Sequence, residues 1–452
     1  MTKTGNTGHN KGMIPDYVNR ILLRLRQAEH TAYAVGGCVR DALMGAVPHD
    51  WDVCTSARPE EIEGVFGDLP QIHTGKKHGT VAVILDHKTV EITTFRTEGV
   101  YLDGRHPSAV TFLSDLAGDL ARRDFTINAM ALDENEGLID LFGGRQDLQD
   151  HMVRAVGDPT RRFEEDALRI LRGLRFASRL DFAIEQETAR AMVAERERLL
   201  GISAERVLTE LKGILVGQAA GRILRDFAPI LFTVLPELAP MAGFEQHSPY
   251  HDSDVWEHTL RALEASPAEV VFRLALLFHD CGKPDCFFRD ENGRGHFYGH
   301  PRRSRELGAE ALRRLKCDNE TMARVLYLIE KHDTWLPGTE RNMRRFLLHE
   351  DPEQVRDLLV VQRCDAVAHA PAARASAVAH VDEWTALLER VLRQQPCLSL
   401  KALALSGDDL LSLGMAPGPR MGQLLNEMLE QVADGDLPND KQALLAYAKN
   451  HL

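Results

Sequence analysis

The chain lacks the two hydrophobic segments that would connect it to a membrane or a secretion route. No stretch reaches the roughly 18 consecutive apolar residues that a membrane-spanning helix needs. The first residues, MTKTGNTGHNKGMIPDY, are polar and contain no apolar signal-peptide core. We therefore expect a disordered start over residues 1–15, a cytoplasmic location and no membrane partner.

Paired cysteines are also missing. The chain has seven cysteines, an odd number, and none of them lies in a CxxC spacing. A scattered, odd set argues against a disulfide framework and against a zinc knuckle. We expect these side chains to be ordinary reduced thiols.

Positive charge is in deficit, because 54 Lys and Arg residues face 67 Asp and Glu residues, for a net charge of −13. This balance argues against a general binder of nucleic acids. Two arginine-rich segments, 161–179 and 301–316, still offer local contacts with phosphate.

What the chain does contain is enough apolar material for several cores: 452 residues, 44% of them apolar. The first third is rich in Val, Ile and Thr with period-two alternation, which indicates strands at 32–35, 51–55, 80–85, 89–95 and 109–113. After about residue 158, apolar positions recur three and four residues apart, which indicates helices at 166–180, 203–217 and 268–282. The predicted fold class is α+β, with an α/β head and a long helical body.

Two aspartates, Asp50 and Asp52, stand one residue apart at a predicted strand, so both side chains point to one face. Two close carboxylates are stable when a divalent cation lies between them, and magnesium prefers such oxygen ligands. Two such metals about 4 Å apart can activate a hydroxyl and stabilise a leaving oxygen. Glu91, a charge inside an apolar strand, is the expected third ligand. The alternative is that DWD is a solvated strand end.

A Gly-Gly turn precedes these aspartates. Gly36 and Gly37 separate a strand from a helix, so the backbone there can approach a ligand closely and present free N–H groups to phosphate. Arg40 follows on the helix and adds positive charge. We expect this turn to bind a triphosphate that the metals bridge.

Seven segments then occur in an order that resembles one family. GGCVRD with HDWDVCT resembles the signature of the tRNA nucleotidyltransferase and bacterial poly(A) polymerase family, class II of the DNA-polymerase-beta-like superfamily. The other segments are VEITTFR (90–96), the flexible-loop motif YLDGRHPSAVTF (101–112), RRDFTINAMAL (122–132), DLFGGRQDL (140–148), RFEEDALRILRGLRFA (162–177) and GISAERVLTEL (201–211).

The resemblance implies the chemistry and several binding residues. A tRNA 3′ hydroxyl attacks the α-phosphate of CTP or ATP, pyrophosphate leaves, and Mg²⁺ is the cofactor of a two-metal site. The catalytic residues are Asp50, Asp52 and Glu91. Asp124 and Asn128 contact ribose. The remaining implied nucleotide-binding residues are Gly36, Gly37, Arg40, Arg123, Asp166, Arg169, Arg172 and Arg175.

Asp166 and Arg169 can select a base. On one helix they would share a face, since they are three residues apart. A carboxylate accepts the amino protons of cytosine or adenine, and a guanidinium donates to their ring acceptors. Uracil and guanine carry a carbonyl in place of the amino group and an N–H in place of the ring acceptor, so both contacts fail. The resemblance implies the same roles, with Glu165 orienting the arginine. Arg206, with Glu205 and Glu210, is expected to support the neck.

A second set of polar residues follows in the helical part. Its order of histidines and aspartates resembles the HD phosphohydrolase domain, and such side chains suit a divalent transition metal. The resemblance implies metal binding by His258, His279, Asp280 and Asp365, with His300 and His332 available for a second metal. A working hydrolase and a body that only holds tRNA both remain open.

We expect five segments. They are the start (1–15), the catalytic nucleotidyltransferase head (16–157), an all-α, base-selecting neck (158–222), an HD-type helical body (223–395) and a helical tail (396–452). CCA addition is the favoured function. The alternatives are an A-adding or CC-adding enzyme, a poly(A) polymerase, or an HD hydrolase as the main activity. No motif sets the oligomeric state.

Overall fold

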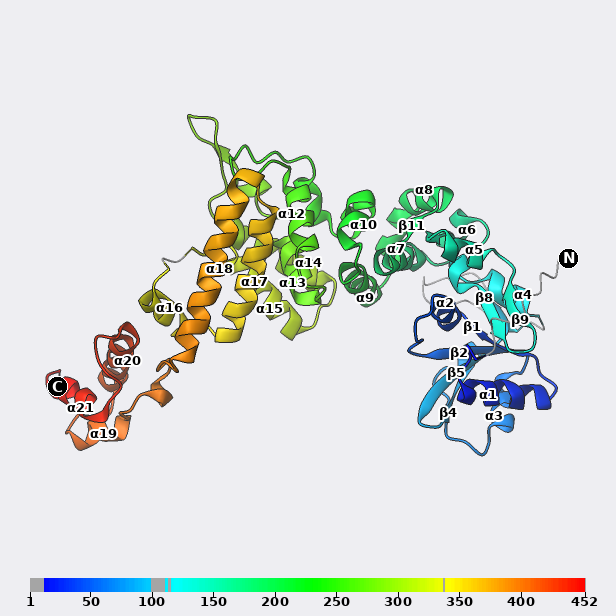
Figure 1. Ribbon diagram of the computed structural model, residues 1–452, viewed down its shortest axis with the longest axis horizontal. Coiled ribbons are helices and arrows are strands. Elements are labelled where there is room, and N and C mark those ends of the chain that lie inside the picture. The colour runs from blue at the N-terminus through cyan, green and yellow to red at the C-terminus, as the bar shows by residue number, and fades with distance from the viewer. Residues whose placement is uncertain (1–11, 99–109, 113–114, 336–337, 452) are drawn as a thin grey trace. The chain divides into compact units, whose positions relative to one another are not determined.

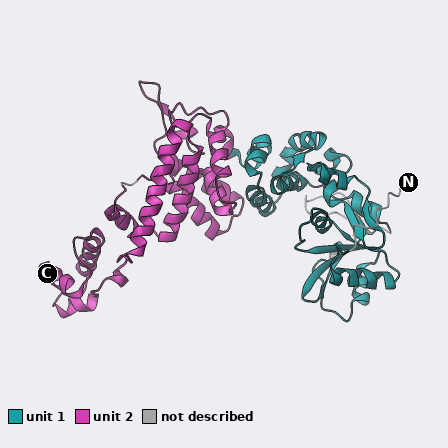
Figure 2. Ribbon diagram, viewed as in Figure 1, with its two compact units in different colours: residues 1–236 teal, residues 237–452 magenta. Residues whose placement is uncertain are grey.

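The computed structural model describes residues 12–98, 110–112, 115–335 and 338–451. The chain divides into two compact units, Met1–Pro236 and Glu237–Leu452 (Figure 2). Each unit has its own hydrophobic core, so each is described by itself. The finer division into head, neck, body and tail stays a prediction.

A mixed seven-stranded sheet forms the centre of the first unit. Its strand order is β3-β4-β5-β2-β1-β8-β9, and β2 pairs with β5 in parallel while the other neighbours are antiparallel. The strands are β1 (Ala32–Val35), β2 (Trp51–Thr55), β3 (Gln71–Ile72), β4 (Thr80–Leu85), β5 (Lys88–Thr94), β8 (Met130–Asp133) and β9 (Gly137–Asp140), and β6 (Arg96–Glu98) pairs with β7 (Val110–Phe112) outside this sheet.

Amphipathic helices cover this sheet. In α1, the buried residues Val18, Ile21, Leu22 and Leu25 recur at the spacing of one helix face. Helices α1 and α3 contact each other and strands of the sheet (Figure 1). The helices of this part are α1 (Asp16–Gln27), α2 (Gly37–Leu43), η1 (Lys76–His78), α3 (Pro59–Val65), α4 (Leu116–Ala121), η2 (Thr126–Asn128) and α5 (Gly144–Gln149).

The rest of the first unit is almost entirely helical. The one small sheet there pairs β10 (Met152–Val153) with β11 (Ala183–Ile184), among the residues that the structure describes. Helices α7 and α9 pack closely along their buried faces. The helices are α6 (Pro159–Glu165), α7 (Leu168–Leu180), α8 (Gln186–Ala194), η3 (Arg196–Gly201), α9 (Ala204–Leu215), α10 (Ala220–Asp226) and α11 (Ala228–Val234).

The second unit is a helical assembly. A short hairpin in it pairs β12 (Phe288–Arg289) with β13 (Gly295–His296). Its first helices are η4 (Pro236–Met241), α12 (Val255–Glu264), α13 (Val270–Phe278), η5 (Pro284–Cys286), α14 (His300–Arg314), α15 (Asn319–Lys331), α16 (Glu340–Leu347), α17 (Pro352–Ala368) and α18 (Pro371–Arg393). After these come η6 (Leu400–Ala402), α19 (Gly407–Ser412), α20 (Pro419–Asp434) and α21 (Lys441–Lys449), which share a separate apolar cluster that includes Leu410, Leu424 and Leu444.

The predicted α+β class is confirmed, and the strands and helices expected from periodicity are present. One local expectation is wrong. Asp166 and Arg169 do not share a helix, because Asp166 has an extended backbone (φ −149°, ψ 102°) between α6 and α7. Of the flexible-loop motif at 101–112, residues 101–109 lie outside the described residues.

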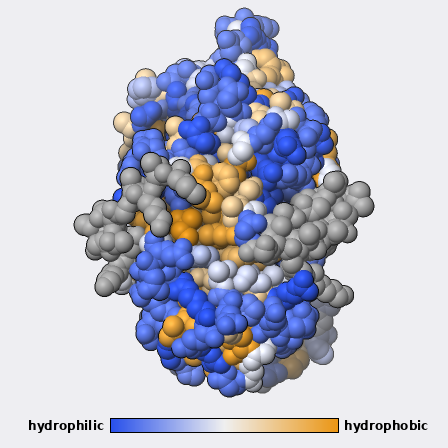
Figure 3. All heavy atoms as spheres, turned by 90° about the vertical axis from the view of Figure 1, so that its right-hand side faces the viewer, coloured by the Kyte–Doolittle hydropathy of each residue, from blue (hydrophilic) through white to orange (hydrophobic). Residues whose placement is uncertain are grey.

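The polar surface agrees with the composition. In the face shown in Figure 3, hydrophilic residues cover most of the surface and apolar residues gather in a central band. No helix in the described part of the chain is both long and apolar enough to cross a membrane.

Candidate active sites

The first candidate site lies on neighbouring parallel strands of the sheet. The register of β2 and β5 pairs Asp52 with Glu91, so the two carboxylates stand side by side. Both side chains are exposed, whereas Trp51 and Val53, on the other face of β2, are buried. The alternation of the strand therefore turns the acidic groups outward while its apolar residues fill the core.

The charge of Asp52 is unfavourable in this position. The surrounding protein removes water from one side of the carboxylate and the Glu91 charge repels it, while Arg123 opposes both effects and Asp50 adds a further repulsion. Together these effects raise the pKa of Asp52 to about 6. A divalent cation at this place would remove the repulsion between the acidic groups.

Asp50 lies just before β2 begins, and its side chain is 79% exposed. Its Oδ2 is 2.9 Å from Nδ1 of His49. Within the described residues, Asp50, Asp52 and Glu91 do not form a group whose ligand atoms all lie within 4.8 Å of one another. Of the three predicted ligands, the structure therefore brings Asp52 and Glu91 side by side, whereas Asp50 does not complete a close group with them.

The turn before α2 needs glycine at its first position. Gly36 has φ +87°, and a Cβ on it would lie 2.9 Å from Nη1 of Arg123. Nη2 of Arg123 is 3.3 Å from Oδ2 of the buried Asp119. The small residue thus lets an arginine held by Asp119 lie against the turn. Asp119 was missed from the sequence, although its i+3 and i+4 spacing to two arginines was a usable signal.

A chain of hydrogen bonds connects α2 to α7. Arg40 donates to Oδ1 of Asn128 at 2.7 Å, and Nδ2 of Asn128 donates to Oδ1 of Asp124 at 3.3 Å. Arg172 contacts Oδ2 of Asp124 through Nε at 2.8 Å and Nη2 at 2.7 Å. Gly37 lies next to the guanidinium of Arg40. The structure thus brings these predicted nucleotide-binding residues together.

Asp124 is buried but stays ionised. Burial alone would raise its pKa, but the charge and hydrogen bond of Arg172, helped by Arg169 and the backbone amide of Phe125, lower the pKa to about 2. Arg175 does not join this network directly. It contacts Glu210 at 2.6 Å and lies over the ring of Phe176.

The two residues predicted to select the base are fixed by different neighbours. Arg169, which is 7% exposed, donates to Glu165 at 3.2 Å and to the carbonyl oxygen of Arg122 at 3.1 Å. Asp166 accepts from the backbone amide of Leu168 at 3.0 Å. The bend between α6 and α7, rather than a shared helix face, sets their relative position.

Arg206 on α9 contacts the predicted base-selecting carboxylate. Its Nη2 is 3.0 Å from Oδ2 of Asp166. The sequence predicted only a supporting role for Arg206, because the two residues are far apart along the chain. Their contact follows from the packing of α7 on α9, which periodicity does not encode.

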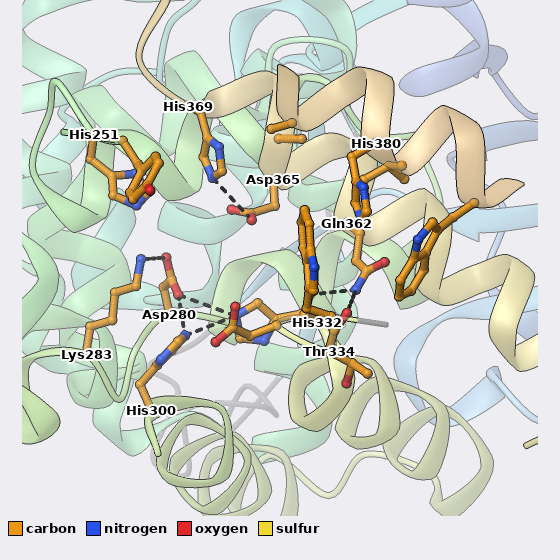
Figure 4. A pocket seen from close by; sticks show the side chains of 17 residues that line it. His251, Asp280, Lys283, His300, His332, Thr334, Gln362, Asp365, His369 and His380 are labelled. Atoms are coloured by element: carbon orange, nitrogen blue, oxygen red, sulfur yellow. Dashed lines mark hydrogen bonds and ion pairs between the residues drawn. The ribbon is translucent and has the colours of Figure 1, made fainter. Parts of the chain in front are cut away.

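The second candidate site, in the second unit, is a buried cluster of histidines and aspartates (Figure 4). Two groups of possible ligands have atoms within 4.8 Å of one another, and Asp280 belongs to both. The first group is His258, His279, Asp280 and Asp365, and the second is Asp280, His300 and His332. All six residues that the sequence predicted as ligands are thus brought together.

The distances define a shared centre. Oδ2 of Asp280 is 3.2 Å from Nε2 of His279, and Oδ1 is 3.3 Å from Nε2 of His300. Oδ1 of Asp365 is 2.7 Å from Nε2 of His258. Nε2 of His332 lies 3.2 Å from Nε2 of His300. Each oxygen of Asp280 therefore faces one of the two groups.

The histidines are oriented by their other ring nitrogens. Nδ1 of each ring donates to a backbone carbonyl oxygen, so Nε2 is the ring nitrogen that faces the centre. The acceptors are Ala368 for His258 (3.4 Å), Leu276 for His279 (2.6 Å), Phe297 for His300 (3.0 Å) and Ile329 for His332 (2.7 Å).

The carboxylates of the cluster and its basic side chains stabilise one another. Burial disfavours the carboxylate of Asp280, but His279 and Lys283 outweigh it and hold its pKa well below the usual value. Burial likewise lowers the pKa of His279, but the charges of Asp280 and Asp365 outweigh it and raise that pKa to about 10. The carboxylate oxygens of Asp280 and Asp365 would also attract a divalent cation.

The donor set fits a divalent transition metal. Nε2 of His279 and both oxygens of Asp280 have no hydrogen bond of normal geometry, although they are buried. Nζ of Lys283 lies 2.7 Å from Asp280 and also donates to Gln246 at 2.9 Å. Imidazole nitrogens and carboxylate oxygens that meet at one centre are the ligands that such metals use.

Comparisons with known families match three segments of the chain. The model described as "Poly A polymerase head domain" matches residues 32–154. "Probable RNA and SrmB- binding site of polymerase A" matches residues 181–240, and "tRNA nucleotidyltransferase domain 2 putative" matches residues 305–448. The first of these segments contains the acidic site.

Curated relatives match nearly the whole chain. A CCA-adding enzyme of Levilactobacillus brevis is 37% identical over 427 residues, which cover 94% of this chain and 95% of the relative. A CCA-adding enzyme of Bacillus licheniformis is 33% identical, covering 94% and 95%. The Bacillus stearothermophilus CCA-adding enzyme in complex with CTP is similar in structure, with a TM-score of 0.72, 30% identity and 96% of each chain covered.

Proposed function

The chain belongs to the class II tRNA nucleotidyltransferase family, and we propose from this membership that it adds the 3′-terminal CCA to tRNA, using CTP and ATP. The observation that carries the proposal is the parallel register that sets Glu91 beside Asp52 in the head. The curated relatives, which match over more than nine-tenths of this chain, are CCA-adding enzymes. Because tRNA, CTP and ATP are cytoplasmic, we place the activity in the cytoplasm.

Asp50, Asp52 and Glu91 would hold Mg²⁺ in the acidic site. When bound, this metal would supply positive charge that lowers the pKa of the attacking 3′ hydroxyl and stabilises the negative charge of the leaving pyrophosphate. The Gly36–Gly37 turn lets the guanidinium groups of Arg123 and Arg40 lie against it, and these groups would add positive charge for the triphosphate. No side chain needs to act as a nucleophile.

The remaining residues would position the nucleotide. Asp124, kept ionised by Arg172, and Asn128, held by Arg40, offer hydrogen bonds to the ribose hydroxyls. Asp166 would accept from the amino group of cytosine or adenine, and Arg169 would donate to a ring acceptor. Glu165 and the carbonyl of Arg122 hold that guanidinium in place, so it is oriented before the base arrives.

The nucleotide specificity can be tested with three RNA substrates. We expect the purified chain to extend tRNA lacking CCA and tRNA ending in C with CTP, and tRNA ending in CC with ATP. Separation of the labelled products by gel electrophoresis checks this. Incorporation of AMP but not CMP would indicate an A-adding enzyme, and incorporation of CMP but not AMP would indicate a CC-adding enzyme. Long A tails on any RNA would indicate a poly(A) polymerase.

A second activity is favoured by the geometry of the helical unit. We propose that the histidine–aspartate cluster binds a divalent transition-metal ion and hydrolyses phosphate esters at RNA ends. The observation that favours it is the meeting of two ligand groups at Asp280. When bound, the metal would supply Lewis-acid activation of water. Lys283, beside Asp280, would add a positive charge near the phosphate.

His279→Ala should abolish this hydrolysis and leave CCA addition intact. The change removes a ring whose Nε2 faces both carboxylates, while the acidic site lies in the other unit. Phosphate release from adenosine 2′-monophosphate and ring opening of a 2′,3′-cyclic phosphate end to a monoester, with Mn²⁺ or Co²⁺ added, measure it. His349→Ala, at an exposed histidine of the same unit, is the matched control. If the unaltered chain hydrolyses neither substrate with either metal, the hydrolase proposal fails and CCA addition is unaffected.

A further inference from the structure

We propose that the cavity at the histidine–aspartate cluster contains a nucleobase platform, formed by Trp335 on His380, so that the cavity binds nucleotides and not phosphate esters in general. The cavity has a volume of about 240 Å³, and both aromatic residues line it together with Asp280 and Lys283. The inference rests on the proposed hydrolase activity in one respect, namely that the phosphate of the ligand lies at Asp280 and Lys283. The base-binding surface is an independent feature of the cavity.

Trp335 is exposed yet held in one orientation. Its side chain is 70% exposed, although an indole of this size is normally covered. Its ring stacks on His380 with centroids 3.6 Å apart and an angle of 7° between the planes. One face is therefore supported by His380, and the exposed remainder offers a flat surface on which a base can stack.

The support continues behind the platform. The ring of Trp384 lies 5.2 Å from that of His380. Trp384 is 5% exposed, and its Nε1 has no hydrogen-bond partner among the residues that the structure describes. The buried indole therefore limits the movement of the His380 ring on which Trp335 rests.

The platform is tied to the metal-ligand cluster through α17. Nε2 of Gln362 donates to the carbonyl oxygens of His332 at 3.0 Å and Thr334 at 2.9 Å (Figure 4). Gln362 lies one helical turn before Asp365, so both side chains lie on the same face of α17. The same helix thus supplies a ligand to the cluster and fixes the segment that leads to Trp335.

The separation suits a nucleotide. Trp335 follows the ligand His332 by three residues, which span at most about 11 Å of chain. A phosphate at Asp280 and Lys283 and a base on Trp335 would therefore belong to one small molecule or one RNA end. Purines should bind better than pyrimidines, because their larger rings cover more of the indole.

Calorimetric titration of the full chain with adenosine 2′-monophosphate, without added metal so that the ester is not hydrolysed, tests the platform directly. We expect Trp335→Ala to weaken the binding by about tenfold, because one stacking contact is lost. Trp335→Phe should restore most of it. Phe288→Ala is the matched control, since Phe288 is another exposed ring (46%) stacked on a histidine, His296, and does not line this cavity.

Hydrolysis of two esters separates a base-binding role from a structural one. Trp335→Ala should lower kcat/KM for adenosine 2′-monophosphate by about tenfold and leave glycerol 2-phosphate, which has no base, unchanged. Equal losses for both esters, or unchanged nucleotide binding, would overturn the proposal. If no ester is hydrolysed, the hydrolase proposal fails on its own, and the titration still decides whether Trp335 binds the base.

Discussion

Replacement of Asp52 by alanine is expected to slow the addition of both CMP and AMP to tRNA by on the order of 10³-fold or more. Asp52 stands beside Glu91 on parallel strands and carries a carboxylate whose pKa is raised to about 6 by its surroundings, which makes it the group with most to gain from a cation. Single-turnover rates with tRNA lacking CCA measure the effect.

Two further measurements make the Asp52 result specific. Asp150→Ala removes an exposed aspartate from the same unit, away from the acidic strands, and should leave the rate unchanged. CTP binding without added metal should survive Asp52→Ala, because the residues that face the base and the ribose are untouched. A variant that keeps a rate within tenfold of the unaltered chain would show that Asp52 does not hold the catalytic metal.

Replacement of Asp166 by alanine should damage base selection more than binding of the triphosphate. We expect CTP and ATP incorporation to fall by about 10²-fold while UTP incorporation stays near its low starting rate, because the acceptor for the amino group is gone. The ratio of CTP to UTP incorporation under single-turnover conditions is the measurement. An unchanged ratio would place base selection elsewhere in the head or neck.

The control for Asp166 comes from the same helical region. Glu164 lies two residues away and forms a half-exposed ion pair with Arg198 at 3.1 Å. Removing a surface ion pair of this kind has little energetic effect. Glu164→Ala should therefore leave both the rate and the CTP-to-UTP ratio as they are, which separates base selection from general damage to α6.

The sequence predicted the strands of the head because their apolar alternation is local. It also predicted Glu91 as the partner of Asp52, since a charge inside an apolar strand requires one. The exact alignment of Asp52 with Glu91 was beyond the sequence, because register depends on how separate strands pair. Alternation placed both side chains on exposed faces but did not show that the faces coincide.

The bend at Asp166 was not predictable from propensity. The segment EEDALR contains no glycine or proline, so its sequence predicts one continuous helix. The backbone is nevertheless extended at Asp166. Its side chain caps the amide of Leu168 and contacts Arg206. Asp commonly bonds to nearby backbone amides at helix starts, and this preference was the usable signal for a break.

The second site was predicted in composition but not in arrangement. The order of histidines and aspartates identified the six ligand positions, whereas the double use of Asp280 required the packing of several helices. For His279, His300 and His332, the acceptor of Nδ1 is the carbonyl oxygen three residues earlier in the chain. Those bonds are local, so that part of the ring orientation is built into each helix terminus.

The pairing of β2 with β5 limits which changes in chain length the head can accept. Side chains alternate along a strand, so deleting one residue within β5 ahead of Glu91 would turn that carboxylate to the opposite face of the sheet. A deletion in the turn between β4 and β5 would shift the hairpin instead and could be absorbed there. Evolution can therefore lengthen or shorten the connections around the acidic strands, whereas the strands themselves must keep their residue count.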